Sequence, residues 1–412
     1  MFFWVARMIM AGFRWQGELP FRNVFYTSII RDKFGRKLSK SLGNSPDPLD
    51  IIATLGADAL RFAIMRIAPI GSDVRFIEER GKANTPKEFD ATESSSEHHF
   101  PQVEEGRNFA NKLWNAARFR QMQGDAGAEA GDLPIYAIDV LAKLAAMEEN
   151  LDRAYGEYRF NEIAQILYDF FWSEYCDWYL ESIKRDVGRD ATPEQKAAAI
   201  RTQDAVLRRF LMHLHPYMPH ITEELWQSLG FAEGGEFLMR TVLPEASPVA
   251  DLAPERVGEA QAQVAAIYSA VGRARNLKAE YNLAANKNVK FIVKPAAGWV
   301  EGELGALALL SGASEATADA AYDPPKGTPA AVTDIGEIYM PLEGLIDIEA
   351  EKARLSKELA KVEGEIKKCN GKLNNANFVE RAKPEVVDQE RQRRDEWEVR
   401  RDQIKAMLEN LG

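Results

Sequence analysis

The chain has 412 residues, of which 46% are hydrophobic, and its formal net charge is −11. This length and apolar content support hydrophobic cores in about two to four domains. No run of about 18 apolar residues occurs, which argues against a membrane span. The apolar start lacks a basic leader and a cleavage site, which argues against a signal peptide. The only cysteines, Cys176 and Cys369, favour a reducing compartment over a disulfide framework or a four-thiolate zinc site.

Residues 1–76 predict an α/β segment built around a lysine-containing loop. The stretch from Val24 to Ile30 is β-branched and aromatic, which predicts a strand, and a helical pattern follows the turn at Pro46. The run between them is Gly35-Arg36-Lys37-Leu38-Ser39-Lys40-Ser41-Leu42-Gly43-Asn44. Glycines let backbone N–H groups approach phosphates, and lysines meet the charge of a departing pyrophosphate. A solvated basic loop is the alternative, but a loop between a strand and a helix favours a nucleotide site.

Residues 77–103 are interpreted as an irregular insertion or linker. The part from Lys82 to Gln102 has no apolar period and includes a triple serine. It also contains His98 and His99, for which no further ligands lie at a suitable spacing. We therefore interpret them as a solvated pair and predict no metal site.

Residues 104–232 predict a helical bundle. Helical periodicity runs over Arg107–Phe119, Ile138–Tyr155, Phe160–Lys184 and Gln195–His213. The third of these stretches is dense in aromatic residues. Aromatic side chains at this spacing can stack on bases, but a buried bundle core is the favoured interpretation.

Residues 233–344 predict a small α+β region. Short strands are expected at Phe237–Leu243, Val289–Val293 and Ile335–Leu342, and a helix is expected over Ala253–Asn276. This helix ends in a basic group: Arg273, Arg275 and Lys278.

Residues 345–412 predict an antiparallel helical hairpin with a coiled-coil seam. Leu355, Leu359, Val362, Ile366 and Cys369 follow one another at alternating steps of four and three. After a break around Asn374–Asn377, a second seam runs from Val387 through Trp397 and Ile404 to Leu411, interrupted by polar residues. Dimerisation or plain scaffolding is the alternative role of such a pair.

These stretches together resemble a known family. The run from Lys37 to Ser41 is similar to the second signature, KMSKS, of class I aminoacyl-tRNA synthetases, with Leu38 where methionine is usual. Three flanking blocks, Phe2–Met8, Pro20–Val24 and Gly56–Phe62, resemble the valine, isoleucine and leucine branch, and the valyl-tRNA synthetases most of all. The resemblance implies the end of a Rossmann-type catalytic domain, an anticodon-binding bundle, a connecting region and a C-terminal tRNA-binding arm.

The resemblance also implies the chemistry. Valine and ATP, with Mg²⁺, would give valyl-adenylate and pyrophosphate, and the acyl group would then pass to tRNA(Val). Lys37 and Lys40 would be the catalytic residues that stabilise the departing charge, and Leu38, Ser39 and Ser41 would complete the ATP-binding run. A monomer in the cytoplasm suits the family.

The remaining implied site residues would bind tRNA. On the bundle's first helix the candidate tRNA-binding residues are Asn108, Lys112, Asn115 and Arg118. On the arm they are Arg354, Lys357, Lys361 and Lys368.

The chain also departs from the family pattern, because no HIGH-type first signature and no editing domain are found. We therefore interpret it as a C-terminal part of a longer enzyme and expect it to be inactive alone. Two alternatives stay open. One is an isoleucyl or leucyl enzyme, which the missing four-cysteine tail and the terminal hairpin disfavour. The other is a non-catalytic tRNA-binding module.

Overall fold

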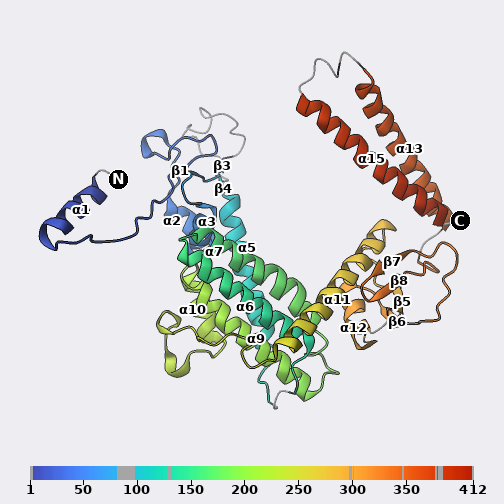
Figure 1. Ribbon diagram of the computed structural model, residues 1–412, viewed down its shortest axis with the longest axis horizontal. Helices are drawn as coiled ribbons and strands as arrows, with labels where there is room; N and C mark the ends of the chain where they lie inside the picture. The colour runs from blue at the N-terminus through green and yellow to red at the C-terminus, as the bar shows by residue number, and fades with distance from the viewer. Residues whose placement is uncertain are drawn as a thin grey trace. The chain divides into compact units, whose positions relative to one another are not determined.

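The computed structural model describes residues 3–80, 98–127, 131–296, 299, 301–345, 348–375, 378 and 384–410 (Figure 1). Most of the predicted insertion, residues 81–97, lies outside these ranges, and so does Leu411 of the second seam. Contacts divide the chain into two compact units, Met1–Gln261 and Ala262–Gly412.

The first unit begins with an α/β segment. Its elements are α1 (Trp4–Trp15), β1 (Ile30–Arg31), η1 (Lys40–Leu42), α2 (Pro48–Leu55), α3 (Ala57–Ile67) and β2 (Val74–Arg75). Strands β1 and β2 pair in parallel, with Ile30 opposite Val74. The strand prediction for Val24–Ile30 is wrong except at Ile30. The carbonyl of Ile29 still accepts the N–H of Val74 at 3.0 Å, but among the described residues no strand pairs with Val24–Ser28, and a strand needs such a partner.

One apolar cluster joins α2 and α3 to the segments that follow them. It consists of Ile51, Ala59, Ala63, Phe76, Phe100 and Val103. Because Phe100 and Val103 stand at the start of the next long helix, the α/β segment and the helical bundle share this core.

The helical bundle follows a short antiparallel pair, β3 (Glu79–Arg80) with β4 (His98–His99). Its helices are α5 (Pro101–Gln121), α6 (Ile135–Gly156), α7 (Phe160–Asp169), the π-helical η2 (Phe170–Tyr179), α8 (Leu180–Ser182), α9 (Pro193–Leu214) and α10 (Pro219–Ser228). The predicted helix over 160–184 is thus divided into three. Phe171, Tyr175 and Tyr179 of η2 are buried, which confirms that the aromatic stretch forms a core.

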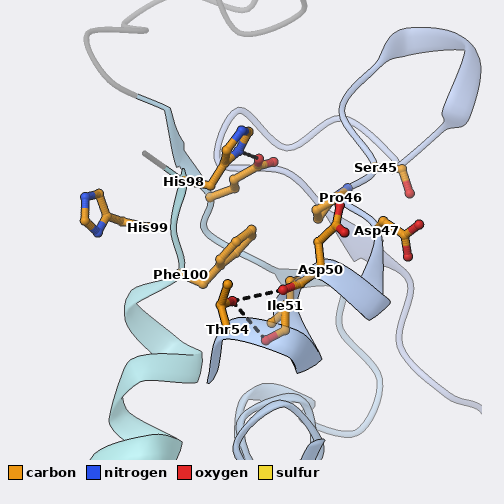
Figure 2. Close-up of a pocket in the computed structure, with 10 residues that line it drawn as sticks. Ser45, Pro46, Asp47, Asp50, Ile51, Thr54, His98, His99 and Phe100 are labelled. Carbon is orange, nitrogen blue, oxygen red and sulfur yellow. Dashed lines mark hydrogen bonds and ion pairs between the residues drawn. The ribbon is translucent and has the colours of Figure 1, made fainter. Parts of the chain in front are cut away.

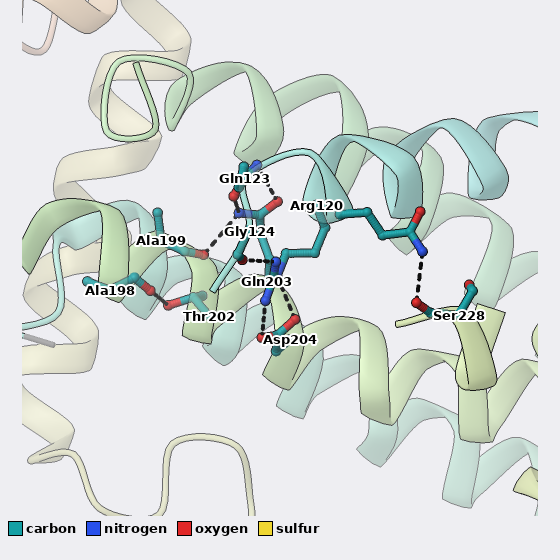
Figure 3. Close-up of polar contacts among 10 residues, drawn as sticks. Arg120, Gln123, Gly124, Ala198, Ala199, Thr202, Gln203, Asp204 and Ser228 are labelled. Atoms are coloured by element: carbon teal, nitrogen blue, oxygen red, sulfur yellow. Dashed lines mark hydrogen bonds and ion pairs between the residues drawn. The ribbon is translucent and has the colours of Figure 1, made fainter. Parts of the chain in front are cut away.

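Polar side chains fix the end of α5 against α9 (Figure 3). Arg120 forms two hydrogen bonds of 2.7 Å to the carboxylate of Asp204. The buried amides of Gln123 and Gln203 pair beside them. At the start of α9, Thr192 and Gln195 form a capping box, which satisfies backbone N–H groups of the first turn.

The chain leaves the bundle through η3 (Glu233–Gly235) and η4 (Leu238–Arg240). The strand predicted over Phe237–Leu243 is therefore wrong. The carboxylate of Glu223 accepts the N–H of Leu238 at 2.9 Å, which holds the chain in a 3₁₀ turn against α10.

The second unit contains a four-stranded sheet. Its elements are the later part of α11 (Pro254–Glu280), β5 (Lys290–Pro295), η5 (Glu301–Glu303), α12 (Leu304–Ser311), β6 (Glu315–Ala318), β7 (Ala330–Thr333) and β8 (Gly336–Tyr339). The strand order is β6-β5-β8-β7, in which β5 and β6 are parallel and the other pairs are antiparallel. The predicted helix over 253–276 and the strands near 289–293 and 335–342 are confirmed.

The chain ends in a helical pair, α13 (Ile348–Leu373) and α15 (Pro384–Asn410). Ion pairs join Lys372 to Glu390 and Arg400 to Glu358, so the two helices run antiparallel. The seam prediction is confirmed, because Leu355, Val362, Ile366 and Cys369 are buried against Val387 and Ile404. In the described part of the chain, no helix has the length and apolarity that crossing a membrane requires.

Candidate functional site

The lysine loop begins as a tight turn after β1. The backbones of Arg31 and Lys37 form an isolated antiparallel β-bridge across the turn. The N–H of Asp32 donates to the carbonyl of Arg36 at 2.9 Å. Gly35 has a φ of 83°, a conformation that side-chain-bearing residues rarely adopt. The turn therefore returns the chain over its own strand and places Lys37 at the start of the signature run.

The buried carboxylate of Asp32 organises this turn. It accepts the N–H groups of Phe34 at 3.0 Å and Arg36 at 2.9 Å, and the Nε of Arg36 at 2.7 Å. Burial raises the pKa of Asp32, but hydrogen bonds from Asn44 and Arg36 outweigh burial and hold that pKa below its usual value. The ionised carboxylate is thus the form that the turn stabilises.

Asn44 closes the loop from its far end. Its side chain is fully buried and donates to Asp32 at 3.0 Å and to the carbonyl of Lys37 at 3.3 Å. Its Oδ1 accepts the N–H of Ser39 at 2.9 Å. The amide group of Asn44 therefore holds the backbone of the signature run at two points, Lys37 and Ser39.

The two candidate lysines stand above this base. Lys37 and Lys40 are exposed, and neither ammonium group has an ion-pair partner among the residues that the structure describes. Leu38 is half-buried, and the hydroxyls of Ser39 and Ser41 lie 2.7 Å apart. The structure thus gathers the predicted residues into two free cations and two hydroxyls on a fixed backbone, which is an arrangement suited to a polyphosphate.

An open hollow of about 640 Å³ lies beside the loop (Figure 2). The hollow is lined by the carboxylates of Asp47, Asp50 and Glu78. Their negative charge would repel a phosphate group. Both histidines of β4 are exposed at its rim, and His98 hydrogen-bonds Glu78 at 2.7 Å. Within the described ranges, no three His, Cys, Asp or Glu side chains gather closely enough to hold a metal ion.

The candidate tRNA-binding residues of α5 divide into two kinds. Asn108, Asn115 and Arg118 are exposed. Lys112 is half-buried, and its Nζ lies 2.6 Å from Asp177 and over the ring of Trp172. Lys112 therefore braces α5 against η2, while the other three side chains face solvent.

The candidates of the C-terminal hairpin divide in the same way. Lys357 and Lys361 are exposed on α13, and no ion pair to either lies within the described part of the chain. Arg354 pairs with Glu358 at 2.9 Å, and Lys368 pairs with Glu365 at 2.6 Å.

The basic end of α11 has an internal use. Arg275 donates twice to the carbonyl of Leu310, and Lys278 donates to the carbonyls of Ser311 and Gly312. These carbonyls end α12, so the two side chains cap that helix. Burial and the neighbouring Arg275 lower the pKa of Lys278.

Sequence reasoning did not assign roles to Asp32, Asp58 and Arg61. Asp32 directly follows a strand, and the other two lie in the block Gly56–Phe62. Asp32 binds Arg36 and Asn44 within the loop, whereas Asp58 and Arg61 bind backbone groups at least 155 residues away, a relationship that residue patterns do not show.

Three family profiles match separate parts of the chain. They are "tRNA synthetases class I (I, L, M and V)" over residues 1–77, "Anticodon-binding domain of tRNA ligase" over 138–293 and "Valyl tRNA synthetase tRNA binding arm" over 347–412. The chain thus combines a class I catalytic segment with two segments named for tRNA.

Curated relatives agree along the whole chain. A valine–tRNA ligase from Chlorobaculum tepidum is 37% identical over 96% of this chain and 43% of that protein. Another from Thermotoga maritima is 35% identical over 100% of this chain and 44% of that protein. The chain therefore spans less than half the length of these relatives. Among solved structures, the match to a Mycobacterium tuberculosis methionyl-tRNA synthetase covers 58% of this chain and 46% of the synthetase chain. The identity is 18% and the TM-score is 0.41.

Proposed function

Because the chain belongs to the valyl-tRNA synthetase family of class I, of which it corresponds to the C-terminal portion, we propose that it serves the ATP-dependent joining of valine to tRNA(Val). The observation that carries this proposal is the pair of lysines, Lys37 and Lys40, that have no ion-pair partner among the described residues and stand on a buried polar base. The five parts that we propose are residues 1–76, 77–103, 104–232, 233–344 and 345–412.

The lysine loop would act in the first step. A carboxylate oxygen of valine attacks the α-phosphorus of ATP, and the bond to pyrophosphate breaks. Negative charge grows on the departing phosphates, and Lys37 and Lys40 would neutralise it, while Ser39 and Ser41 donate hydrogen bonds. Mg²⁺ would be held mainly by phosphate oxygens and water, because the run contributes cations and hydroxyls and no carboxylate.

The helical bundle and the C-terminal hairpin would hold the tRNA while the valyl group is transferred to the terminal ribose of the tRNA. On α5, the exposed Asn108, Asn115 and Arg118 are the side chains we assign to this contact. On α13, Lys357 and Lys361 are free to meet phosphates. A monomer suffices for these roles, and the two buried free cysteines suit the cytoplasm.

We propose that this chain alone does not activate valine. The described α/β segment contains only the β1–β2 pair, whereas parallel sheets are normally larger and covered on both faces. A non-catalytic tRNA-binding module shares this expectation, so activity must be tested after the missing portion is supplied.

The experiment has two parts. The purified chain is titrated with tRNA(Val), and valine-dependent ATP–pyrophosphate exchange is measured with the chain alone and with a chimera that carries the remaining portion of the Chlorobaculum tepidum relative. We expect tRNA binding, no exchange alone and exchange by the chimera. A chimera that binds tRNA but lacks exchange favours the module, and exchange by the chain alone refutes the inactivity that we propose.

A further inference from the structure

Asp58 caps a helix that lies far from it in the sequence. It is buried in the first turn of α3, and its carboxylate accepts the N–H groups of His220 at 3.3 Å and Ile221 at 2.6 Å. These groups belong to the first turn of α10, where no side chain of Met218 supplies a cap. A helix start leaves such N–H groups unsatisfied and favours a negative charge. Asp58 meets both needs.

Arg61 binds the same connecting segment at a second point. It lies one turn further along α3, and its Nη2 donates to the carbonyl of Pro216 at 3.0 Å. Asp58 and Arg61 thus bind opposite backbone groups of the segment that joins α9 to α10. The carboxylate of Asp58 accepts from N–H groups, and the guanidinium of Arg61 donates to a carbonyl. The two contacts together therefore fix both the distance and the orientation of this segment relative to α3.

Helix α3 is also in close contact with α5. The rings of Phe62 and Phe109 stack at 4.9 Å. A Cβ on Gly106 would lie 2.5 Å from the carbonyl oxygen of Ala59, so only glycine allows the approach. Arg66 at the end of α3 pairs with Glu105 at 3.0 Å. The helix is therefore part of the bundle's packing along its length.

The lysine loop connects to α3 through one short helix and one glycine. Gly56, with a φ of 96°, ends α2 and begins α3. Ile51 of α2 lies in the same core as Ala59 and Val103. A displacement of α3 would therefore displace α2 and the chain that follows Asn44.

We propose that Asp58 and Arg61 are positioning residues that register the lysine loop against the helical bundle. The two contacts make the loop's base and the α9–α10 turn one mechanical unit, so that a nucleic acid held by the bundle sets the place of the lysines. We call the contacts of Asp58 and Arg61 with residues 216–221 the joint. Its role in catalysis rests on the proposed function, whereas its existence rests on the contacts alone.

Hydrogen exchange of the isolated chain tests the joint without any ligand. The variants are Asp58→Ala, Asp58→Asn and Arg61→Ala, with the exposed Asp251→Ala, which lies outside both measured segments, as the control. Loss of a helix cap predicts a rise in exchange of roughly threefold to tenfold over residues 216–222. The joint predicts that residues 45–56 rise with them, while α6 does not change. Asp58→Asn keeps one acceptor and should be intermediate.

Two results would overturn the joint. One is a rise over residues 216–222 with residues 45–56 unchanged, which means that Asp58 only caps α10. The other is an equal rise throughout the bundle, which means a general loss of stability.

A second measurement adds tRNA(Val). We expect tRNA to slow exchange over residues 45–56 in the wild-type chain, and Asp58→Ala to lose this protection at an unchanged Kd. Protection that survives in Asp58→Ala contradicts the proposal, and so does bound tRNA that leaves wild-type exchange in this segment unchanged. If the wild-type chain does not bind tRNA(Val), the proposed function fails, while the ligand-free comparison still decides the joint.

Discussion

The side-chain amide of Asn44 donates to the carboxylate of Asp32 at 3.0 Å, beneath the lysine loop. Both side chains are buried, and they stand at opposite ends of the loop. Their contact closes the loop at its base, so the exposed lysines above it need little further ordering when an anion arrives. Charged groups that are already in place stabilise a transition state more than groups that must first be reoriented during the reaction.

Replacing Asn44 should therefore loosen the loop. Asn44→Ala leaves Asp32 and the N–H of Ser39 each without one buried partner, and we expect a loss of about 1–3 kcal/mol in the free energy of unfolding. Urea unfolding measures this loss, and hydrogen exchange should rise over residues 37–44. Asn115→Ala, which removes an exposed amide, is the control. A variant as stable as this control would show that the contact is dispensable.

Replacing the lysines should affect chemistry and leave stability unchanged. Lys37→Ala and Lys40→Ala remove exposed side chains without partners among the described residues, so urea unfolding should match the wild type. In the chimera, each should raise the barrier to adenylate formation by about 2–4 kcal/mol, as expected for loss of a charge-stabilising group. Lys33→Ala, in the same turn, is the control, because its ammonium lies over the ring of Phe34. An unchanged single-turnover rate for Lys40→Ala would remove that residue from its assigned role.

Periodic packing was predictable from the sequence. The seam of α13, which includes Leu355 and Val362, and the aromatic core of η2 are repeated patterns for which burial is the favoured explanation. The signature run was recognisable for a different reason, since its lysines and serines, and the glycines that flank it, lie within ten residues of one another in the chain. Such local features need no knowledge of the rest of the fold.

Features that depend on distant partners were not predictable. Val24–Ile30 has the composition of a strand, but in the described residues only its end, at Ile29 and Ile30, bonds to a neighbouring strand. Lys112 looks like a surface cation, yet Asp177 and Trp172, far along the chain, hold it. Asp58 carries no local mark of its contact with α10. Each of these outcomes is decided by tertiary contacts, which override local preference.

The bundle should lose stability in acid through Glu148. Its carboxylate accepts from Arg209 at 2.7 Å and from His213 at 3.0 Å. Burial raises the pKa of Glu148, but these partners outweigh burial and hold it below the ordinary value of 4.5. A carboxyl with a lowered folded pKa stabilises the fold above its unfolded pKa, and this contribution disappears as the pH falls through the folded pKa.

The measurement is urea unfolding over a pH series that starts above 4.5 and descends below it. Glu148→Gln should have a flatter pH dependence than the wild type and should be less stable above pH 4.5, where Arg209 loses its counter-charge. Glu149→Gln, at the exposed neighbouring position, should follow the wild-type curve. If the two variants have the same slope, Glu148 is not the group that titrates.

The hairpin should bind tRNA through Lys357 and Lys361, which form no ion pair within the described part of the chain. Each phosphate contact that releases a counterion contributes about 0.9 to the slope of log K against log salt for duplex nucleic acid. Lys357→Glu and Lys361→Glu should each weaken tRNA(Val) binding and reduce the slope by about this amount. The measurement is a titration of the chain with tRNA at several salt concentrations.

Lys196→Glu is the control, because it makes the same charge change on α9, which belongs to the other compact unit. A general electrostatic effect would weaken binding equally in all three variants, whereas a defined contact affects the α13 variants more. Lys368→Glu adds a graded comparison. Its ammonium already lies 2.6 Å from Glu365, so part of its charge is compensated in the free chain. We therefore expect a smaller loss there than at Lys361, and an equal loss at both positions would show that pairing within the hairpin does not select the side chains that meet the tRNA.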